Sequence, residues 1–268
     1  MLCYTLFDPV TFVNPLNEHR PILLSVPHAS SIVPEEIRSL VRLTDKQLLE
    51  YVDLHTDKIY DIRGYHTILG SVCRVFVDTN RAPDDIAKEY EKGEEGVVVH
   101  TTQDGIPVYT TLPSEKLIEQ LISKYHAPYH EHIDNLMSKI RFLFDCHSYL
   151  PIGPRMKKDA GQPRPDFNIG NRMYSACTRE HTVFIRDFLE KRHYSVGINI
   201  PYMGGYILAH HCHRFRIPTF LVPGMQIEIS QGLYVDQTTL DPVPDRITQM
   251  NTLMQEMVDV FFENFFTE

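Results

Sequence analysis

Two histidines and a glutamate lie in hydrophobic segments that are far apart in the chain. His28 follows the apolar segment 21–27, His147 follows the segment 141–146, and Glu228 lies between two isoleucines. Imidazoles and a carboxylate at the ends of buried strands are the ligands of a catalytic zinc ion, which keeps one position for water. The pattern predicts a zinc hydrolase. On spacing alone, two hydrogen-bonded surface histidines among the fourteen in the chain are an equal alternative.

The carboxylate ligand has several candidates. Asp53, His55 and Asp57 lie within five consecutive residues, and each could instead cap a helix or be solvated. We rank Asp57 first, because an unpaired carboxylate completes a set of two histidines and one acid. Asp145 lies on the same strand face as His147 and can orient that imidazole without binding the metal.

Glu228 and Arg74 are charged residues inside apolar segments. Burial raises the pKa of a carboxyl group, and a raised pKa suits Glu228 to move protons at neutral pH. The alternative for both residues is a strand with one wet face.

The cluster His210-His211-Cys212-His213 contains metal-binding residue types, but adjacent side chains diverge on a regular backbone. We therefore expect the main metal at the dispersed set, and the cluster is also compatible with a polar loop beside an active site.

The order of hydrophobic patterns favours an α/β sheet. Apolar and β-branched segments predict strands, and apolar positions at helical spacing predict helices between them. An irregular stretch rich in proline, 151–171, is expected to be a surface loop. In such sheets the site lies beyond the carboxyl ends of the strands. The predicted strands are 21–27, 67–78, 141–146, 219–222 and 226–229, and the predicted helices are 45–62 with a break at 53–56, 117–140, 175–192 and 247–262.

Composition limits the possible partners. The net charge of −9 disfavours nucleic acid and anionic membranes, and no apolar run or signal-like start points to a membrane or to export. We expect one cytoplasmic domain over residues 1–268. The five cysteines contain no C-x-x-C pair and are expected to be reduced, with Cys146 a buried structural thiol.

Several segments together resemble the N-formylglutamate amidohydrolase family along most of the chain. Each segment alone would be weak, but their order and combination are specific. The segments are SVPHASSIVP, DLHTDKIYD, CRVFVDTNRAPDD, YHAPYHEHI, FDCHSYLP, PDFNIGN, YSVGINIPYMGGYI and MQIEISQGLYVD.

The resemblance implies a single-domain α/β fold with a mixed, mostly parallel sheet flanked by helices, phosphorylase/hydrolase-like and similar to that of zinc carboxypeptidases. It implies an amidohydrolase with one Zn²⁺ per chain and a small N-acyl amino acid as substrate, with N-formyl-L-glutamate first and histidine catabolism as the pathway. By chain order it assigns the roles as follows: His28, Asp57 and His147 as zinc ligands, Glu228 as general base and acid, Arg74 as the group that polarises the carbonyl, and Asn80 and Arg81 as binders of a substrate carboxylate.

Two departures bear on the substrate. The segment 204–207 is followed by Leu208 and Ala209, where the family leads us to expect a basic residue, and the segment 157–162 resembles an insertion. A carboxypeptidase-like or cell-wall peptide amidase is therefore an alternative, which would need an open groove. A metal-binding protein without turnover is the other, although the presence of Glu228 speaks against it.

Overall fold

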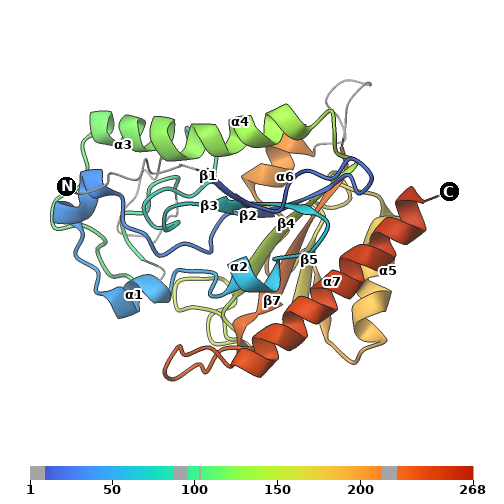
Figure 1. Ribbon diagram of the computed structural model, residues 1–268. Coiled ribbons are helices and arrows are strands. Elements are labelled where there is room, and N and C mark those ends of the chain that lie inside the picture. Colours follow the sequence, from blue (N-terminus) through green and yellow to red (C-terminus); the bar gives the residue numbers. More distant parts are fainter. Residues whose placement is uncertain (1–9, 87–95, 103, 213–221, 268) are drawn as a thin grey trace, which may run out of the picture.

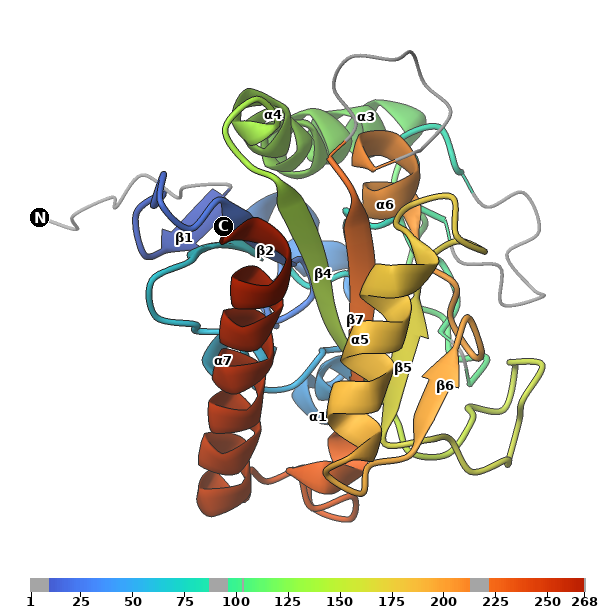
Figure 2. The ribbon, with the colours of Figure 1, turned by 90° about the vertical axis from the view of Figure 1, so that its right-hand side faces the viewer.

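One mixed sheet of seven strands runs through the computed structural model, which describes residues 10–86, 96–102, 104–212 and 222–267. Its strands lie in the order β1-β3-β2-β4-β7-β5-β6 (Figures 1 and 2). Strands β3, β2, β4 and β7 are parallel to one another, whereas β1 and β5 pair antiparallel with β3 and β7. The predicted α/β class is confirmed. The strands are β1 Val10–Val13, β2 Ile22–Val26, β3 His66–Gly70, β4 Phe142–Tyr149, β5 Phe167–Gly170, β6 Val196–Ile198 and β7 Gly224–Ser230.

Helices cover both faces of this sheet. In Figure 1, α3 and α4 extend across one face, and α7 and α5 lie on the other. A π-helical turn, Ile122–His126, joins α3 to α4, so the predicted helix 117–140 forms as a single run that ends earlier. The helices are α1 Asp45–Leu49, α2 Thr56–Ile59, α3 Glu115–Leu121, α4 Ala127–Leu136, α5 Arg179–Glu190, α6 Tyr206–His211 and α7 Pro244–Phe266, with 3-10 turns at Glu35–Leu40 and Gln231–Leu233.

The alternation along β4 decides which side chains meet which helices. Phe142 and Phe144 pack in the core that contains α7, whereas Leu143 packs in the core that contains α4 and α6. Because side chains alternate, Asp145 and His147 lie on the same face as Leu143. All eight residues of β4 are buried, as expected for a central parallel strand.

The break predicted between two short helices is confirmed. Thr44 caps α1 with its side chain, and α2 begins only at Thr56, after His55 adopts a left-handed φ of 60°. The chain between the two helices, which includes Asp53, is therefore not helical. It passes close to the end of β2, where the Asp53 amide donates to the His28 carbonyl at 3.0 Å.

The predicted strand 67–78 is wrong beyond Gly70. Its second half contains turns in which the amides of Phe76 and Val77 donate to the Cys73 carbonyl. Val75, Phe76 and Val77 are buried all the same, so the apolar pattern reported burial and not strand pairing.

The segment 151–171 is also more ordered than expected, since Phe167–Gly170 forms β5. Residues 219–221 of a predicted strand lie outside the described residues, and β7 begins at Gly224. The four described cysteines are buried and form no disulfide bond. Burial raises the pKa of the Cys146 thiol well above its usual value, which fits a structural role.

Candidate active site

Neighbouring central strands present polar side chains on one face of the sheet. His147 on β4 is directly opposite Glu228 on β7, and Asp145 is opposite Gln226 one pair earlier. All four are buried. A row of buried polar groups at the carboxyl end of parallel strands is the usual place for a site in this fold class.

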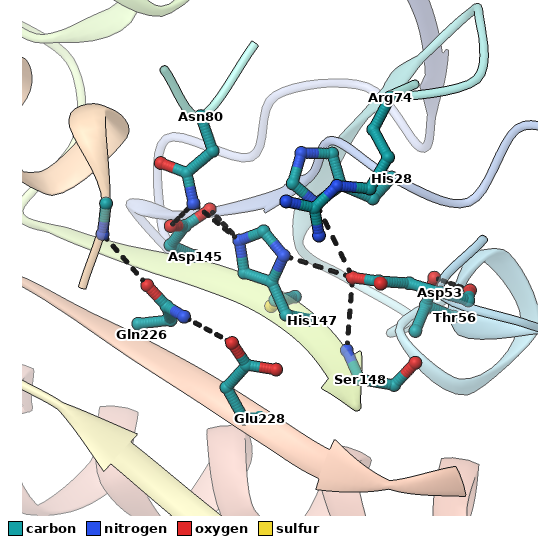
Figure 3. A network of polar contacts seen from close by, with 12 residues as sticks. His28, Asp53, Thr56, Arg74, Asn80, Asp145, His147, Ser148, Gln226 and Glu228 are labelled. Carbon is teal, nitrogen blue, oxygen red and sulfur yellow. Dashed lines mark hydrogen bonds and ion pairs between the residues drawn. The ribbon is translucent and has the colours of Figure 1, made fainter. Parts of the chain in front are cut away.

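His147 forms a candidate metal site with two further buried residues, His28 and Asp53. Ligand atoms of His28, Asp53 and His147 all lie within 4.8 Å of one another. Asp53 Oδ2 lies 3.1 Å from His147 Nδ1 and 3.6 Å from His28 Nδ1 (Figure 3). His28 Nδ1 is buried and has no hydrogen-bond partner. A buried ring nitrogen that has no hydrogen-bond partner and faces a carboxylate fits a cation between the two groups.

A carboxylate fixes the other nitrogen of each histidine. His28 Nε2 donates to Asp78 Oδ1 at 2.8 Å, and His147 Nε2 lies 3.1 Å from Asp145 Oδ1 and 3.0 Å from Asn80 Nδ2. These contacts orient the two rings so that both Nδ1 atoms face Asp53. The expected orienting role of Asp145 agrees with this contact.

The structure places Asp57, the acid expected as third ligand, apart from the two histidines. Asp57 lies half-buried in the first turn of α2, outside the group that contains His28 and His147. Asp53 lies in that group, because its segment runs beside the ends of β2 and β4, where its carboxylate also accepts from the Ser148 amide at 3.2 Å.

Burial and close charges set the protonation of the group. Burial alone would raise the pKa of Asp53, but the hydrogen bond from His147 and the nearby His28 imidazole hold it well below its usual range. Burial would lower the pKa of His147, yet Asp145 and Asp53 raise it well above its usual value. Both shifts favour a positive charge close to the Asp53 carboxylate.

Glu228 is a carboxyl group in an apolar setting. Burial raises its pKa to about 8, although the charge of His147 acts in the opposite direction. Gln226 donates from Nε2 to Glu228 Oε1, and Gln226 Oε1 accepts from the Gly205 amide. Glu228 Oε2 is buried without a partner. One oxygen is thus held and the other is available for proton transfer.

Arg74 and Asn80 are both tied to the carboxylates behind the histidines. Arg74 Nη2 donates to Asp78 Oδ2 at 2.8 Å, and Asn80 Nδ2 donates to Asp145 Oδ2 at 3.2 Å. The Asn80 side-chain oxygen accepts from the Ile207 amide at the start of α6. The Asn80 side chain, expected from the resemblance to bind a substrate carboxylate, thus has hydrogen bonds within the protein that place it beside the histidines.

A cavity of about 460 Å³ opens onto these groups. Its lining includes His28, Asp53, His147 and Glu228, and also the cations Arg74, Arg81, Arg164 and Arg172. Its volume suits a small molecule. Positive charge in its wall suits a substrate that carries a carboxylate.

The arginines of the wall differ in their partners. Arg164 is buried and paired with Asp159 at 2.6 Å. Arg172 has no acidic partner among the described residues; its Nη1 donates to the carbonyls of Gly204 and Gly205 at 2.9 and 3.3 Å, and its buried Nε has no partner. Arg172 also has a left-handed φ of 50°. Sequence reasoning missed it, because no local pattern marks an arginine that tertiary contacts leave without an acid.

His130 of α4 and His126 of the preceding π-helical turn hold the segment that contains Asn80. His130 Nε2 donates to the Thr79 carbonyl and His126 Nε2 donates to the Arg81 carbonyl, both at 2.8 Å. Burial lowers the pKa of His130 to about 2, which keeps its ring neutral. The cluster at 210–213 lies nearby: His210 and His211 are on α6, away from the His28 group, and His213 lies outside the described residues.

Comparisons with known proteins identify the family of the chain. The family model for N-formylglutamate amidohydrolase matches residues 20–235. No curated protein sequence matches the chain significantly. In the part of the chain that the structure describes, no helix has the length and apolar character to span a bilayer.

Two solved structures share the fold. The N-formylglutamate amidohydrolase from Ralstonia eutropha JMP134 is similar with a TM-score of 0.79 and 19% identity, over 96% of this chain and 99% of that chain. A gene product of Agrobacterium tumefaciens is similar with a TM-score of 0.69 and 15% identity, over 95% of each chain. The matched residues 20–235 make up most of the sequence and include each side chain of the site, so the chain belongs to the N-formylglutamate amidohydrolase family and is a hydrolase of the amidohydrolase type.

Proposed function

We propose that this protein is a zinc-dependent amidohydrolase that releases formate from an N-formyl amino acid, with N-formyl-L-glutamate as the leading substrate. One observation carries the proposal. The unpartnered His28 Nδ1 and the unpartnered Glu228 Oε2 belong to the same cavity wall, where two histidines and Asp53 converge.

The residues present fit a catalytic zinc ion. His28, Asp53 and His147 would hold it, a set of two nitrogens and one oxygen that leaves a position open. When bound, zinc would lower the pKa of a water molecule and polarise the amide carbonyl. Asp78 and Asp145 would keep the two imidazoles oriented for it.

Glu228 would move the protons of the reaction. Its raised pKa lies near neutrality, where a carboxyl group can both take and return a proton. Oε2 would accept a proton from the water that attacks the formyl carbon and deliver it to the amine as the carbon–nitrogen bond breaks. The products are formate and the free amino acid.

Arg74 would stabilise the negative charge that develops on the amide oxygen. Asp78 holds its guanidinium in place, and Arg74 lines the same cavity as Glu228. Because Asp78 also fixes His28, one carboxylate positions a metal ligand and an oxyanion donor together.

Arg172 is the cation that we assign to a substrate carboxylate, with Arg81 beside the cavity as a second candidate. Two carbonyls hold Arg172, so its remaining nitrogens are available for an anion without competition from an acid in the described chain. A planar guanidinium matches a carboxylate in two parallel hydrogen bonds.

The test compares N-formyl-L-glutamate with N-formyl-L-glutamine, which replaces the side-chain carboxylate by an amide of equal size. We expect the wild type to prefer the glutamate compound by kcat/KM, and Arg172→Gln to reduce that preference by roughly tenfold to a hundredfold. Glu228→Gln should keep its metal and lose turnover by at least about a hundredfold.

Two results would contradict the proposal. Wild-type turnover in Glu228→Gln would remove Glu228 from the reaction. Faster cleavage of a peptide than of any N-formyl amino acid would instead favour a peptide amidase.

A further inference from the structure

A second group of metal-ligand types lies between α4 and α6. Ligand atoms of Asp134, His210 and His211 fall within 4.8 Å of one another. Asp134 belongs to α4, and the two histidines end α6, which lies beside α4 in Figure 2. None of the three lines the cavity that contains His28.

The hydrogen bonds around His211 require one positive charge more than two neutral imidazoles supply. His130 Nε2 must carry a proton, because its partner at 2.8 Å is the Thr79 carbonyl. His130 Nδ1 is 2.9 Å from His211 Nε2, and this contact takes a second proton. His211 Nδ1 then lies 3.1 Å from Asp134 Oδ1, and a bare nitrogen would face a bare oxygen there.

A cation between His211 Nδ1 and Asp134 resolves this contact. The Asp134 side chain is 56% exposed, so water can solvate its carboxylate although partial burial raises its pKa, whereas the His211 side chain is 1% exposed. A proton on His211 would place an imidazolium in a buried position, which is costly. A metal ion would use the nitrogen and the oxygen as ligands.

His210 supplies the third ligand. Its Nδ1 lies 3.2 Å from the Tyr206 hydroxyl, which can accept a hydrogen bond from Nδ1–H and leave Nε2 for the metal. Two imidazoles and a carboxylate suit zinc and related divalent transition metals, and not calcium or magnesium.

We propose that Asp134, His210 and His211 form a second binding site for a divalent transition-metal ion, which links α4 to α6. The amides of Tyr206 and Ile207 at the start of α6 donate to Asn80 at 3.0 and 2.9 Å, so the second site lies on the framework that positions Asp145 and His147.

The experiment measures zinc bound per chain by mass spectrometry after equilibrium dialysis against buffered zinc, using full-length protein without a histidine tag. We expect a second zinc equivalent in the wild type, with its affinity weakened by roughly tenfold or more in Asp134→Asn and His210→Gln. Glu131→Gln, another exposed acid on α4, should bind zinc as the wild type does. Zinc should also raise the melting temperature of Asp53→Asn but not of the double variant Asp53→Asn/Asp134→Asn.

Asp53→Asn separates this proposal from the proposed function. If the wild type binds one zinc ion per chain and Asp53→Asn binds none, the proposed second site is wrong and the proposed catalytic site is supported. If the only equivalent disappears in Asp134→Asn, the catalytic assignment fails instead. Equal zinc binding by Asp134→Asn and Glu131→Gln would also overturn the second site, because a proton would then fill the place between His211 and Asp134.

Discussion

Asp53 and Asp57 are chemically identical residues that the fold separates. Only Asp53 lies with the two histidines, whereas Asp57 remains half-buried at the start of α2. We expect Asp53→Asn to weaken zinc binding at the catalytic site beyond the roughly 10- to 100-fold cost of losing an outer contact. Asp57→Asn is the matched control and should bind zinc normally. If Asp57→Asn loses this zinc and Asp53→Asn keeps it, Asp57 is the third ligand and Asp53 is not.

The raised pKa of Glu228 predicts how the stability of the metal-free protein depends on pH. The unfolded chain loses this proton near 4.5, but the folded chain keeps it until about 8. The favourable contribution is therefore complete below pH 4.5 and is lost as the pH rises toward 8. Glu228→Gln has no proton to lose, so its free energy of unfolding should exceed that of the wild type increasingly with pH, by on the order of a few kcal/mol.

Urea unfolding between pH 5 and pH 9 in the presence of a chelator measures this difference. The exposed Glu263→Gln serves as the control and should run parallel to the wild type. A Glu228→Gln curve that also stays parallel would show that the carboxyl group is already ionised at neutral pH.

Residue types alone identified part of the site. His28, His147 and Glu228 could be proposed because each lies in or directly after an apolar segment that forms a central strand. The sequence could not decide whether Asp53 or Asp57 lies beside the histidines, since this depends on the path of the loop that contains Asp53 along the ends of β2 and β4. Arg172 carries no local signal at all.

At the scale of elements, the close approach of α6 to Asn80 depends on Gly205. A β-carbon at Gly205 would lie 2.4 Å from Asn80 Oδ1 and 2.5 Å from its Cγ. Gly205→Ala must therefore displace the Asn80 side chain, which donates to Asp145. We expect a loss of about 1–3 kcal/mol in the free energy of unfolding and a lower kcat.

Gly161→Ala is the control for that substitution. Its φ of +71° disfavours alanine, but nothing lies within 4 Å of the added carbon. It should lose some stability and keep its kcat. If Gly205→Ala also keeps its kcat, Asn80 does not position the catalytic histidines.

Elements were predictable where burial and pairing coincide. The central strands β2, β4 and β7 are buried on both faces, and their apolar residues mark them in the sequence despite the polar site residues in β4 and β7. Residues 71–78 are also mostly apolar, but they are buried in turns. An apolar pattern shows that side chains are buried, but it does not show with which strand, if any, the backbone forms hydrogen bonds. The short strand β5 was missed since proline-rich flanking sequence hid it.

At the scale of the whole molecule, the catalytic group joins parts of the chain that are distant in sequence. His28 follows β2, Asp53 lies in the loop before α2, and His147 lies on β4. A metal bound only by the folded chain stabilises it by mass action, about 2.7 kcal/mol at a hundred times its dissociation constant. We therefore expect metal binding and folding to be coupled in this protein.

The most direct measurement is the rate of formate release from N-formyl-L-glutamate by untagged protein before chelation, after chelation and after zinc is restored. We predict that the chelator abolishes release, that zinc restores it in the wild type, and that zinc does not restore it in Asp53→Asn. Release that persists after complete removal of metal, or a zinc-loaded wild type that cleaves no N-formyl amino acid, would contradict the account.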